Sequence, residues 1–184
     1  MASSYGEDAS KQALRTAYLD LPKLTPAYQA RLDGEALVHL RVFPGYRDAS
    51  VVLVFPSQRE EADTHGPARQ AAQDGKVVAT PTFSADGTVT FYVTNDEGER
   101  VPLDEELFAE SICLIPGLVF DAEGYRVAYA AGYIDNFLAS YPGLKVAMAR
   151  GVQISSNPLP HDDHDVPVDV LVSDGAVWMC RRVQ

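Results

Sequence analysis

The stretch PGLVFDAEGYRVAYAAGYIDNFL, residues 116–138, decides the fold class of this 184-residue chain. An apolar run at residues 112–115 precedes it and predicts a short buried strand that ends at a Pro-Gly turn. Apolar residues then recur at helical spacing over 134–138. A strand, a loop and a helix in this order place backbone N–H groups and a helix N-terminus where a phosphate can bind. The same pattern also occurs in α/β folds as an ordinary connection between a strand and a helix that binds no ligand.

Strands and helices alternate over the rest of the chain. Helices are expected at residues 10–21, 26–40 and 66–74, and strands at 50–55, 76–79, 88–94, 145–149, 168–173 and 176–180. This alternation predicts a three-layer αβα fold with a mostly parallel sheet covered by helices on both faces. With no internal repeat and no long linker, residues 1–184 are expected to form one domain. Ligands in such sheets bind at the carboxyl ends of the strands, where the 116–138 loop lies.

Composition limits the class of partner and the compartment. The formal charge of −11 argues against nucleic acid as a partner, because such proteins carry a basic footprint. The sequence shows no signal-peptide core and no membrane-spanning run, and its two cysteines lie far apart. We therefore expect a cytoplasmic protein with no membrane association.

Two polar groups of residues stand near the predicted strand ends. Gly132, Tyr133 and Asp135 are ordered as a turn glycine, an aromatic wall and a carboxylate able to hold a hard cation. Residues 161–165, HDDHD, come just before a β-branched strand. By themselves these five residues fit either a solvated loop or a metal site of imidazole and carboxylate ligands.

Four sequence blocks, taken together, carry a family resemblance. They are KQALR at 11–15, EADT at 61–64 with GKVVATP at 75–81, PGLVFDAEGYRVAYAAGYID at 116–135, and HDVPVD at 164–169. In this order, and nearly from end to end, the chain resembles the 5-formyltetrahydrofolate cyclo-ligase family, also called methenyltetrahydrofolate synthetase. The resemblance implies a cyclo-ligase-like α/β fold and an ATP- and Mg²⁺-dependent cyclodehydration. The formyl oxygen of an N-formyl group is phosphorylated, a neighbouring atom attacks the activated carbon, and phosphate leaves as a five-membered ring closes.

The resemblance also implies roles for individual residues. Catalytic roles fall to Lys11, Arg15 and Arg126, and the nucleotide contacts to these three with Ala128, Ala130, Ala131, Gly132 and Tyr133. Substrate contacts fall to Gln58, Glu61, Asp63, Tyr129, Tyr133 and Ile134, and magnesium to Asp135 and Asp165. Without the resemblance, Lys11 and Arg15 also fit a solvated helix face, and Asp63 also fits a helix cap.

The chain departs from the family pattern inside the loop. The pattern is close to R-L-G-x-G-x-G-Y-Y-D-R, whereas Ala128, Ala130, Ile134 and Asn136 stand here in place of two glycines, a tyrosine and an arginine. Glycine reaches positive φ freely, and an alanine forced there costs roughly 1–2 kcal/mol. The expected substrate is therefore either 5-formyltetrahydrofolate or a specialised N-formyl compound, free or carrier-bound, such as an oxazole-forming N-formylglycyl intermediate. The alternatives are a catalytically degenerate folate- or nucleotide-binding protein and a metal-binding protein that uses residues 161–165.

Overall fold

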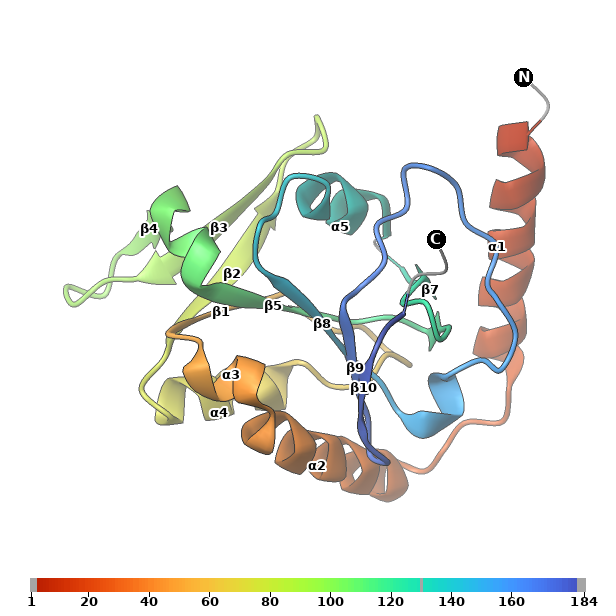
Figure 1. Cartoon of the computed structure of the whole chain (residues 1–184), viewed down its shortest axis with the longest axis horizontal. Helices are drawn as coiled ribbons and strands as arrows, with labels where there is room; N and C mark the ends of the chain where they lie inside the picture. Colours follow the sequence, from red (N-terminus) through yellow and green to blue (C-terminus); the bar gives the residue numbers. More distant parts are fainter. Residues whose placement is uncertain (1–2, 130, 182–184) are drawn as a thin grey trace.

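The computed structural model describes residues 3–129 and 131–181, and its centre is one eight-stranded mixed sheet (Figure 1). The strand order is β10-β9-β8-β5-β1-β2-β3-β4. These strands are β1 (Val51–Val54), β2 (Val77–Phe83), β3 (Val89–Thr94), β4 (Arg100–Pro102), β5 (Ser111–Ile115), β8 (Leu144–Met148), β9 (Val170–Val172) and β10 (Val177–Met179). The five strands from β9 to β2 run parallel, and β10, β3 and β4 add antiparallel edges. The prediction of a mostly parallel sheet is confirmed.

Helices on one face cover the first core. They are α2 (Pro26–Val42), α3 (Pro44–Asp48) and α4 (His65–Gln73), which lie below the sheet in Figure 1. Leu40 and Tyr46 from these helices pack with Val52 and Val54 of β1 and with alternate residues of β5 and β8. Thr25 begins α2 by accepting a hydrogen bond from the backbone N–H of Tyr28 at 3.2 Å, just before a proline at the first helical position.

The opposite face carries the second core and the elements that build the site. Val51 and Leu53 of β1 point to this side, as the two-residue period of a strand requires, and pack with Ile134 and Leu138 of α5 (Ala131–Leu138). The two-stranded hairpin of β6 (Val119–Phe120) and β7 (Arg126–Val127) and the long helix α1 (Ser3–Asp20) lie beyond it. The predicted three-layer arrangement is confirmed.

Strand β2 extends further than the sequence suggests. Its parallel pairing with β1 ends at Ala79, but it continues as an antiparallel partner of β3 as far as Phe83. Pro81 favours a strand end because proline lacks an N–H donor. Here β2 has already left β1, so Pro81 pairs only with Phe91 of β3 and the missing donor is not needed on the other side.

The remaining helical elements are short. Two 3₁₀ turns complete the chain: η1 (Glu105–Glu110) lies between β4 and β5, and η2 (Gly151–Gln153) lies between β8 and β9. Within residues 3–129 and 131–181, no helix combines the length and the apolar character that crossing a membrane requires.

Candidate active site

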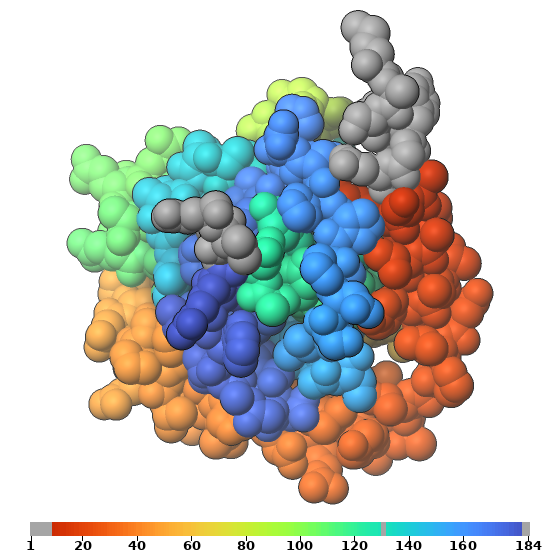
Figure 2. Space-filling view, turned by 45° about the vertical axis from the view of Figure 1, so that its right-hand side comes forward, coloured from red at the N-terminus to blue at the C-terminus, as the bar shows by residue number. Residues whose placement is uncertain are grey.

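Four separate segments meet beside the β6–β7 hairpin. Lys11 and Arg15 come from α1, Arg126 from β7, Asp135 from α5, and Asp165 from the segment that leads into β9. In both Figure 1 and Figure 2 this last segment, in blue, lies beside α1, in red. The structure therefore brings together the predicted phosphate-binding cations and the predicted magnesium ligands.

Helix α1 is oriented by a small apolar cluster. Leu14 and Tyr18 pack against the buried side chains of Val119, Val127 and Leu159. This contact turns the face that carries residues 11 and 15 toward the hairpin, since residues one helical turn apart share a face. The sequence allowed a solvated face for these two cations, but both are only partly exposed.

Both cations of α1 have partners in the body of the protein. Lys11 Nζ donates to Asp165 Oδ2, and a second carboxylate, that of Asp162, lies 4.0 Å away. Arg15 Nε donates to the carbonyl oxygen of Ala128 at 3.2 Å. The hydrogen bonds of a phosphate could replace those that these side chains make now, because lysine and arginine both bind phosphate oxygens readily.

A buried arginine holds the centre of the cluster. The Arg126 guanidinium donates from Nη2 to Asp135 Oδ1 at 3.1 Å and from Nη1 to the carbonyl oxygen of Val166 at 3.0 Å. The backbone N–H of Val166 donates to the same Asp135 oxygen at 3.1 Å. The Nε of Arg126 is buried and has no hydrogen-bond partner among the described residues. The two donated hydrogen bonds fix Arg126 between α5 and the segment that carries Asp165.

Asp135 and Asp165 form a linked carboxylate pair. Burial raises the pKa of Asp135, although the positive charge of Arg126 opposes this shift. Burial also acts on Asp165, but the hydrogen bond from Lys11, the backbone hydrogen bond from Asp162 and the charge of Lys11 together outweigh it and lower the pKa of that carboxyl. A hydrogen bond between the two carboxyl groups also contributes. One carboxylate is thus held ionised beside another that retains a proton more easily.

The donor set of this pair fits magnesium. Mg²⁺ is usually bound in proteins by one or two carboxylates, with phosphate oxygens and water completing the shell. Asp135 and Asp165 supply the two carboxylates, and the flanking cations Lys11 and Arg126 suit the negative charge of a nucleotide. The residues present therefore fit a magnesium–nucleotide complex.

A glycine and an aspartate hold the segment that carries Asp165. Gly124 has φ +92° and its carbonyl oxygen accepts from Val168 N at 2.9 Å, and a Cβ at this position would collide with the Val168 backbone. Asp121 accepts from the backbone N–H groups of Tyr125 and Leu159, at 3.0 and 2.9 Å. The segment is thereby fixed at both ends over the hairpin turn.

The alternative of a metal site within residues 161–165 finds no support in the described part of the chain. No group of three or more histidine, cysteine, aspartate or glutamate side chains able to hold a metal ion occurs there. His161 instead stacks on Tyr125, with ring centroids 3.5 Å apart and an interplanar angle of 5°. Asp162 accepts from the backbone N–H of His164 at 2.8 Å.

A second carboxyl group is buried at the end of β1. Glu61 is 4% exposed, and its side chain accepts from the backbone N–H of Gln58 at 3.0 Å and from that of Tyr129. Burial raises the pKa of Glu61 to about 7, although these hydrogen bonds and the charge of Arg126 oppose the shift. Glu61 is therefore a carboxyl group that exchanges a proton near neutral pH.

Glu61 faces a small cavity of about 20 Å³ that three of the predicted substrate residues line. These are Gln58, Glu61 and Ile134, and Phe83 of β2 completes the wall. Tyr133 is 37% exposed and meets Phe83 edge-on, with ring centroids 5.2 Å apart. Sequence analysis missed Phe83, although its position just after the GKVVATP block was a signal that could have found it.

Two other predicted substrate residues lie around this cavity rather than in it. The hydroxyl of Tyr129 is buried and has no partner among the described residues. Asp63 accepts from the backbone N–H groups of His65 and Gly66, both at 2.9 Å, so it caps α4, as the alternative interpretation had it. Its role as a substrate contact stays a prediction.

Ala128 is less strained than its replacement of a glycine suggests. Among the described residues, Arg59 is the only non-glycine residue with a positive φ, so Ala128 does not occupy the left-handed region. Ala128 is also fully buried and offers its carbonyl oxygen to Arg15. Gly132 has open space where a Cβ would lie. Ala130 lies outside the described residues, and Ala131 is described only as the first residue of α5.

Paired acids beside several cations, at the end of an α/β sheet where the strands finish, are typical of enzymes that bind phosphate esters. Residues 7–174 match the sequence profile of the 5-formyltetrahydrofolate cyclo-ligase family. The chain belongs to this family, which consists of ATP-dependent ligases.

Individual relatives agree with this assignment. The chain is 27% identical to the 5-formyltetrahydrofolate cyclo-ligase of Escherichia coli K12 over 174 residues, which cover 84% of this chain and 94% of the relative. The structure of the Aquifex aeolicus 5,10-methenyltetrahydrofolate synthetase superposes with a TM-score of 0.74 at 22% identity, covering 97% of this chain and 94% of the other. The corresponding structure of the Mycoplasma pneumoniae synthetase gives a TM-score of 0.68 at 16% identity, covering 91% and 98%. These structural similarities establish the fold.

Proposed function

We propose that this chain catalyses an ATP- and Mg²⁺-dependent cyclodehydration of an N-formyl group. The observation that carries the proposal is that Lys11 pairs with Asp165 and Arg126 pairs with Asp135, and that these two carboxylates are themselves linked. Arg15, one helical turn after Lys11, is bonded to the Ala128 carbonyl oxygen. Three cations and two acids at one point suit a triphosphate with its metal, which is the co-substrate that formyl activation needs. The role of each residue is part of the proposal.

The reaction first converts the formyl oxygen, a poor leaving group, into a good one. An amide oxygen leaves poorly, so the formyl oxygen attacks the γ-phosphoryl group of ATP and ADP departs. A neighbouring nucleophile on the substrate then adds to the activated carbon and loses a proton. Phosphate leaves with the former formyl oxygen, and the five-membered ring is closed. Positioning and neutralisation of charge supply most of the catalysis of such a phosphoryl transfer.

The residues divide this work by their place in the cluster. Lys11 and Arg15 bind phosphate oxygens from the α1 side, and Arg126 adds a positive charge beside the Asp135 carboxylate. Asp135 and Asp165 would hold the magnesium ion, which when bound neutralises phosphate charge and aligns the phosphate oxygens. Each of these groups is held by other parts of the chain, so the site is largely preorganised.

Glu61 is the group best suited to accept the proton. It lies at the small cavity beside Ile134 and Phe83, where the wall is apolar. With a pKa of about 7 it is ionised in half of the molecules at neutral pH and can take a proton from the attacking group. Its two backbone donors, Gln58 N and Tyr129 N, fix the direction of the carboxylate.

The first experiment gives the purified protein Mg²⁺-ATP and 5-formyltetrahydrofolate, and follows ADP and the methenyl product together. Stoichiometric formation of both would show that 5-formyltetrahydrofolate is a substrate. Asp165→Ala should abolish turnover, because it removes a magnesium ligand. The matched control is Asp96→Ala, which changes an aspartate in the β3–β4 turn far from the site in sequence and should retain wild-type turnover. Full activity of Asp165→Ala would refute the proposed metal role.

Ile134 favours a second substrate for the same chemistry. It is 2% exposed and fills the place of the family's second tyrosine, so the cavity lacks one hydroxyl. A specialised N-formyl compound is therefore the alternative substrate, for instance an N-formylglycyl thioester whose enol oxygen attacks to give an oxazole. If ADP forms with this thioester and not with the folate, the substrate has changed. If Mg²⁺-ATP raises the melting temperature but no ADP forms with either, the chain is a nucleotide-binding protein without turnover.

A further inference from the structure

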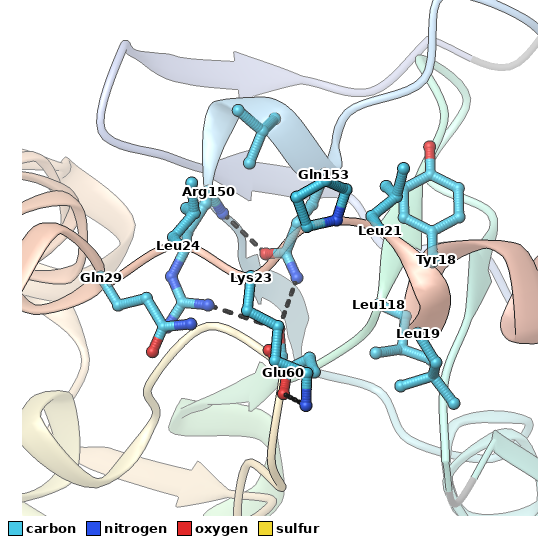
Figure 3. A pocket seen from close by; sticks show the side chains of 12 residues that line it. Tyr18, Leu19, Leu21, Lys23, Leu24, Gln29, Glu60, Leu118, Arg150 and Gln153 are labelled. Carbon is cyan, nitrogen blue, oxygen red and sulfur yellow. Dashed lines mark hydrogen bonds and ion pairs between the residues drawn. The ribbon is translucent and has the colours of Figure 1, made fainter. Parts of the chain in front are cut away.

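A groove of about 330 Å³, one wall of which includes Glu60, opens between the end of α1 and the 150–153 segment (Figure 3). One wall is the end of α1 and the connection to α2, with Tyr18, Leu21 and Lys23. The opposite wall consists of Glu60, Leu118 and Val152, with Arg150 and Gln153 behind them. Ligand pockets in proteins start at about 300 Å³, so the groove is large enough for a small molecule or for part of a larger one.

The walls of the groove are mainly apolar, and its charges are already paired. Lys23 Nζ lies 2.8 Å from the carboxylate of Glu60. Arg150 donates to both carboxylate oxygens of Asp33, at 3.0 and 2.8 Å. The side-chain amide of Gln153 is used by Arg150 N and by the carbonyl oxygen of Glu60. Each cation that lines the groove thus has an anionic partner, and the groove has no surplus positive charge to attract an anion.

A polar group able to bind a ligand remains in the groove. The side-chain amide of Gln29 faces the groove and has none of the contacts drawn in Figure 3. The groove also lies next to the carboxyl group that we assign to the reaction, because Glu60 lines the groove and Glu61 lines the small cavity.

We propose that this groove binds a neutral, elongated arm of the substrate, an apolar chain with amide groups that extends away from the N-formyl end. The proposal rests on the proposed function. Apolar walls with paired charges favour such a ligand over one that carries carboxylates or phosphates, because an anion would have to displace Glu60 or Asp33 from its cation. The side-chain amide of Gln29 supplies a hydrogen bond for an amide group of the arm.

The geometry also separates the groove from the nucleotide. The phosphate-binding cations lie at Lys11 and Arg15, whereas the groove begins at Tyr18, up to two helical turns further along α1. A substrate whose arm lies in the groove would have its other end near Glu61, because Glu60 lines the groove and Glu61 lines the small cavity. It would then present its formyl end to a nucleotide held at the carboxylate pair.

Pantetheine is the probe for the neutral arm, and p-aminobenzoylglutamate is the probe for an anionic one. Binding to the full-length protein is measured by ligand-observed NMR, so no turnover is needed. Val152→Arg places a long cation in the groove from a side chain that is 63% exposed and so tolerates replacement. Val38→Arg is the matched control, since Val38 on α2 is 60% exposed and lies outside the groove. Leu21→Arg, from the opposite wall, is a second blocking variant in case Val152→Arg does not fold.

We expect pantetheine to bind the wild-type protein and Val38→Arg equally, and both blocking variants at least about tenfold more weakly, as the loss of one apolar contact predicts. N-formylglycyl pantetheine thioester should likewise show a higher KM in the blocking variants, whereas the truncated N-acetylcysteamine thioester should not. Equal pantetheine binding in all variants would overturn the proposal. Tighter binding of p-aminobenzoylglutamate at the same site would overturn it as well.

The failure of this inference can be told apart from failure of the proposed function. If no variant forms ADP with any N-formyl compound while pantetheine still binds and is blocked at Val152, the groove assignment stands and the catalytic proposal fails. If ADP forms normally but the blocking variants behave like Val38→Arg, the catalytic proposal stands and the groove assignment fails.

Discussion

Replacement of Glu61 by glutamine should remove a pH dependence from the stability of the protein. The pKa of Glu61 rises from 4.5 to about 7 in the folded state because the side chain is buried. Between these two pH values the folded protein holds a proton that the unfolded chain has released. The unfolded state binds fewer protons in this window, so the free energy of unfolding falls as the pH rises, and the full benefit of the neutral carboxyl exists only below pH 4.5.

The magnitude follows from the size of that window. A span of about 2.5 pH units at 1.36 kcal/mol per unit gives about 3 kcal/mol, lost as the pH rises to just above 7. Glutamine has nearly the same shape and no charge, so Glu61→Gln should not show this loss. Relative to the wild type, the variant should therefore gain about 3 kcal/mol between pH 4.5 and pH 8.

Urea denaturation followed by circular dichroism, at intervals from pH 4.5 to 8.5, measures both proteins. Subtraction of one curve from the other removes the contribution of the other acidic side chains, which the two proteins share. A difference that stays constant with pH would refute the reasoning, because it would mean that Glu61 has the same pKa in the folded and unfolded states. Turnover of the wild type should also fall as the pH drops below about 7 if Glu61 accepts the proton, because the protonated carboxyl cannot take another.

Three further predictions test the site and its supports. Lys11→Met should weaken Mg²⁺-ATP binding, measured by calorimetry, by about tenfold or more, because it removes one hydrogen bond to a charged group. Arg31→Met, at an exposed position, is the control and should leave the affinity unchanged; equal weakening by both variants would contradict the role of Lys11. Asp135→Ala should lower the free energy of unfolding by about 3–5 kcal/mol in urea, because it leaves a buried guanidinium unpaired, and a loss below about 1 kcal/mol would be inconsistent with that pair. Gly124→Ala should be far more destabilising than Gly75→Ala. Both glycines have a positive φ, which costs an alanine about 1–2 kcal/mol, but only at Gly124 would the added Cβ collide with backbone atoms. Similar melting temperatures for the two variants would rule this out.

The fold was largely predictable because its signals are local. Apolar runs at residues 50–55 and 112–115 and the β-branched run before residue 173 indicate buried parallel strands, and the structure has strands at all three places. The end of β2 was less predictable, because Pro81 suggests a strand end and only the pairing with β3 shows why the strand continues. The single-domain organisation stays a prediction.

The site was predictable as a set of residues but not as a set of contacts. Family resemblance named Arg126 and Asp135, which form an ion pair nine positions apart, yet both are also bonded to the backbone of Val166, which lies 31 and 40 positions away. The raised pKa of Glu61 results from burial, which no short sequence pattern encodes. The groove joins residues near 20, 60, 118 and 152, so its existence became apparent only from the folded chain.

Two of the side chains that connect helix α1 to the rest of the protein are the same ones that we propose bind the nucleotide. Lys11 and Arg15 now hold Asp165 and the Ala128 carbonyl oxygen, contacts that join the N-terminal helix to the rest of the molecule. A triphosphate bound by both cations would replace these contacts within the protein by contacts with its own oxygen atoms. The measured affinity for nucleotide is then the net result of two competing equilibria, and any change that loosens the helix also alters how tightly the nucleotide is held.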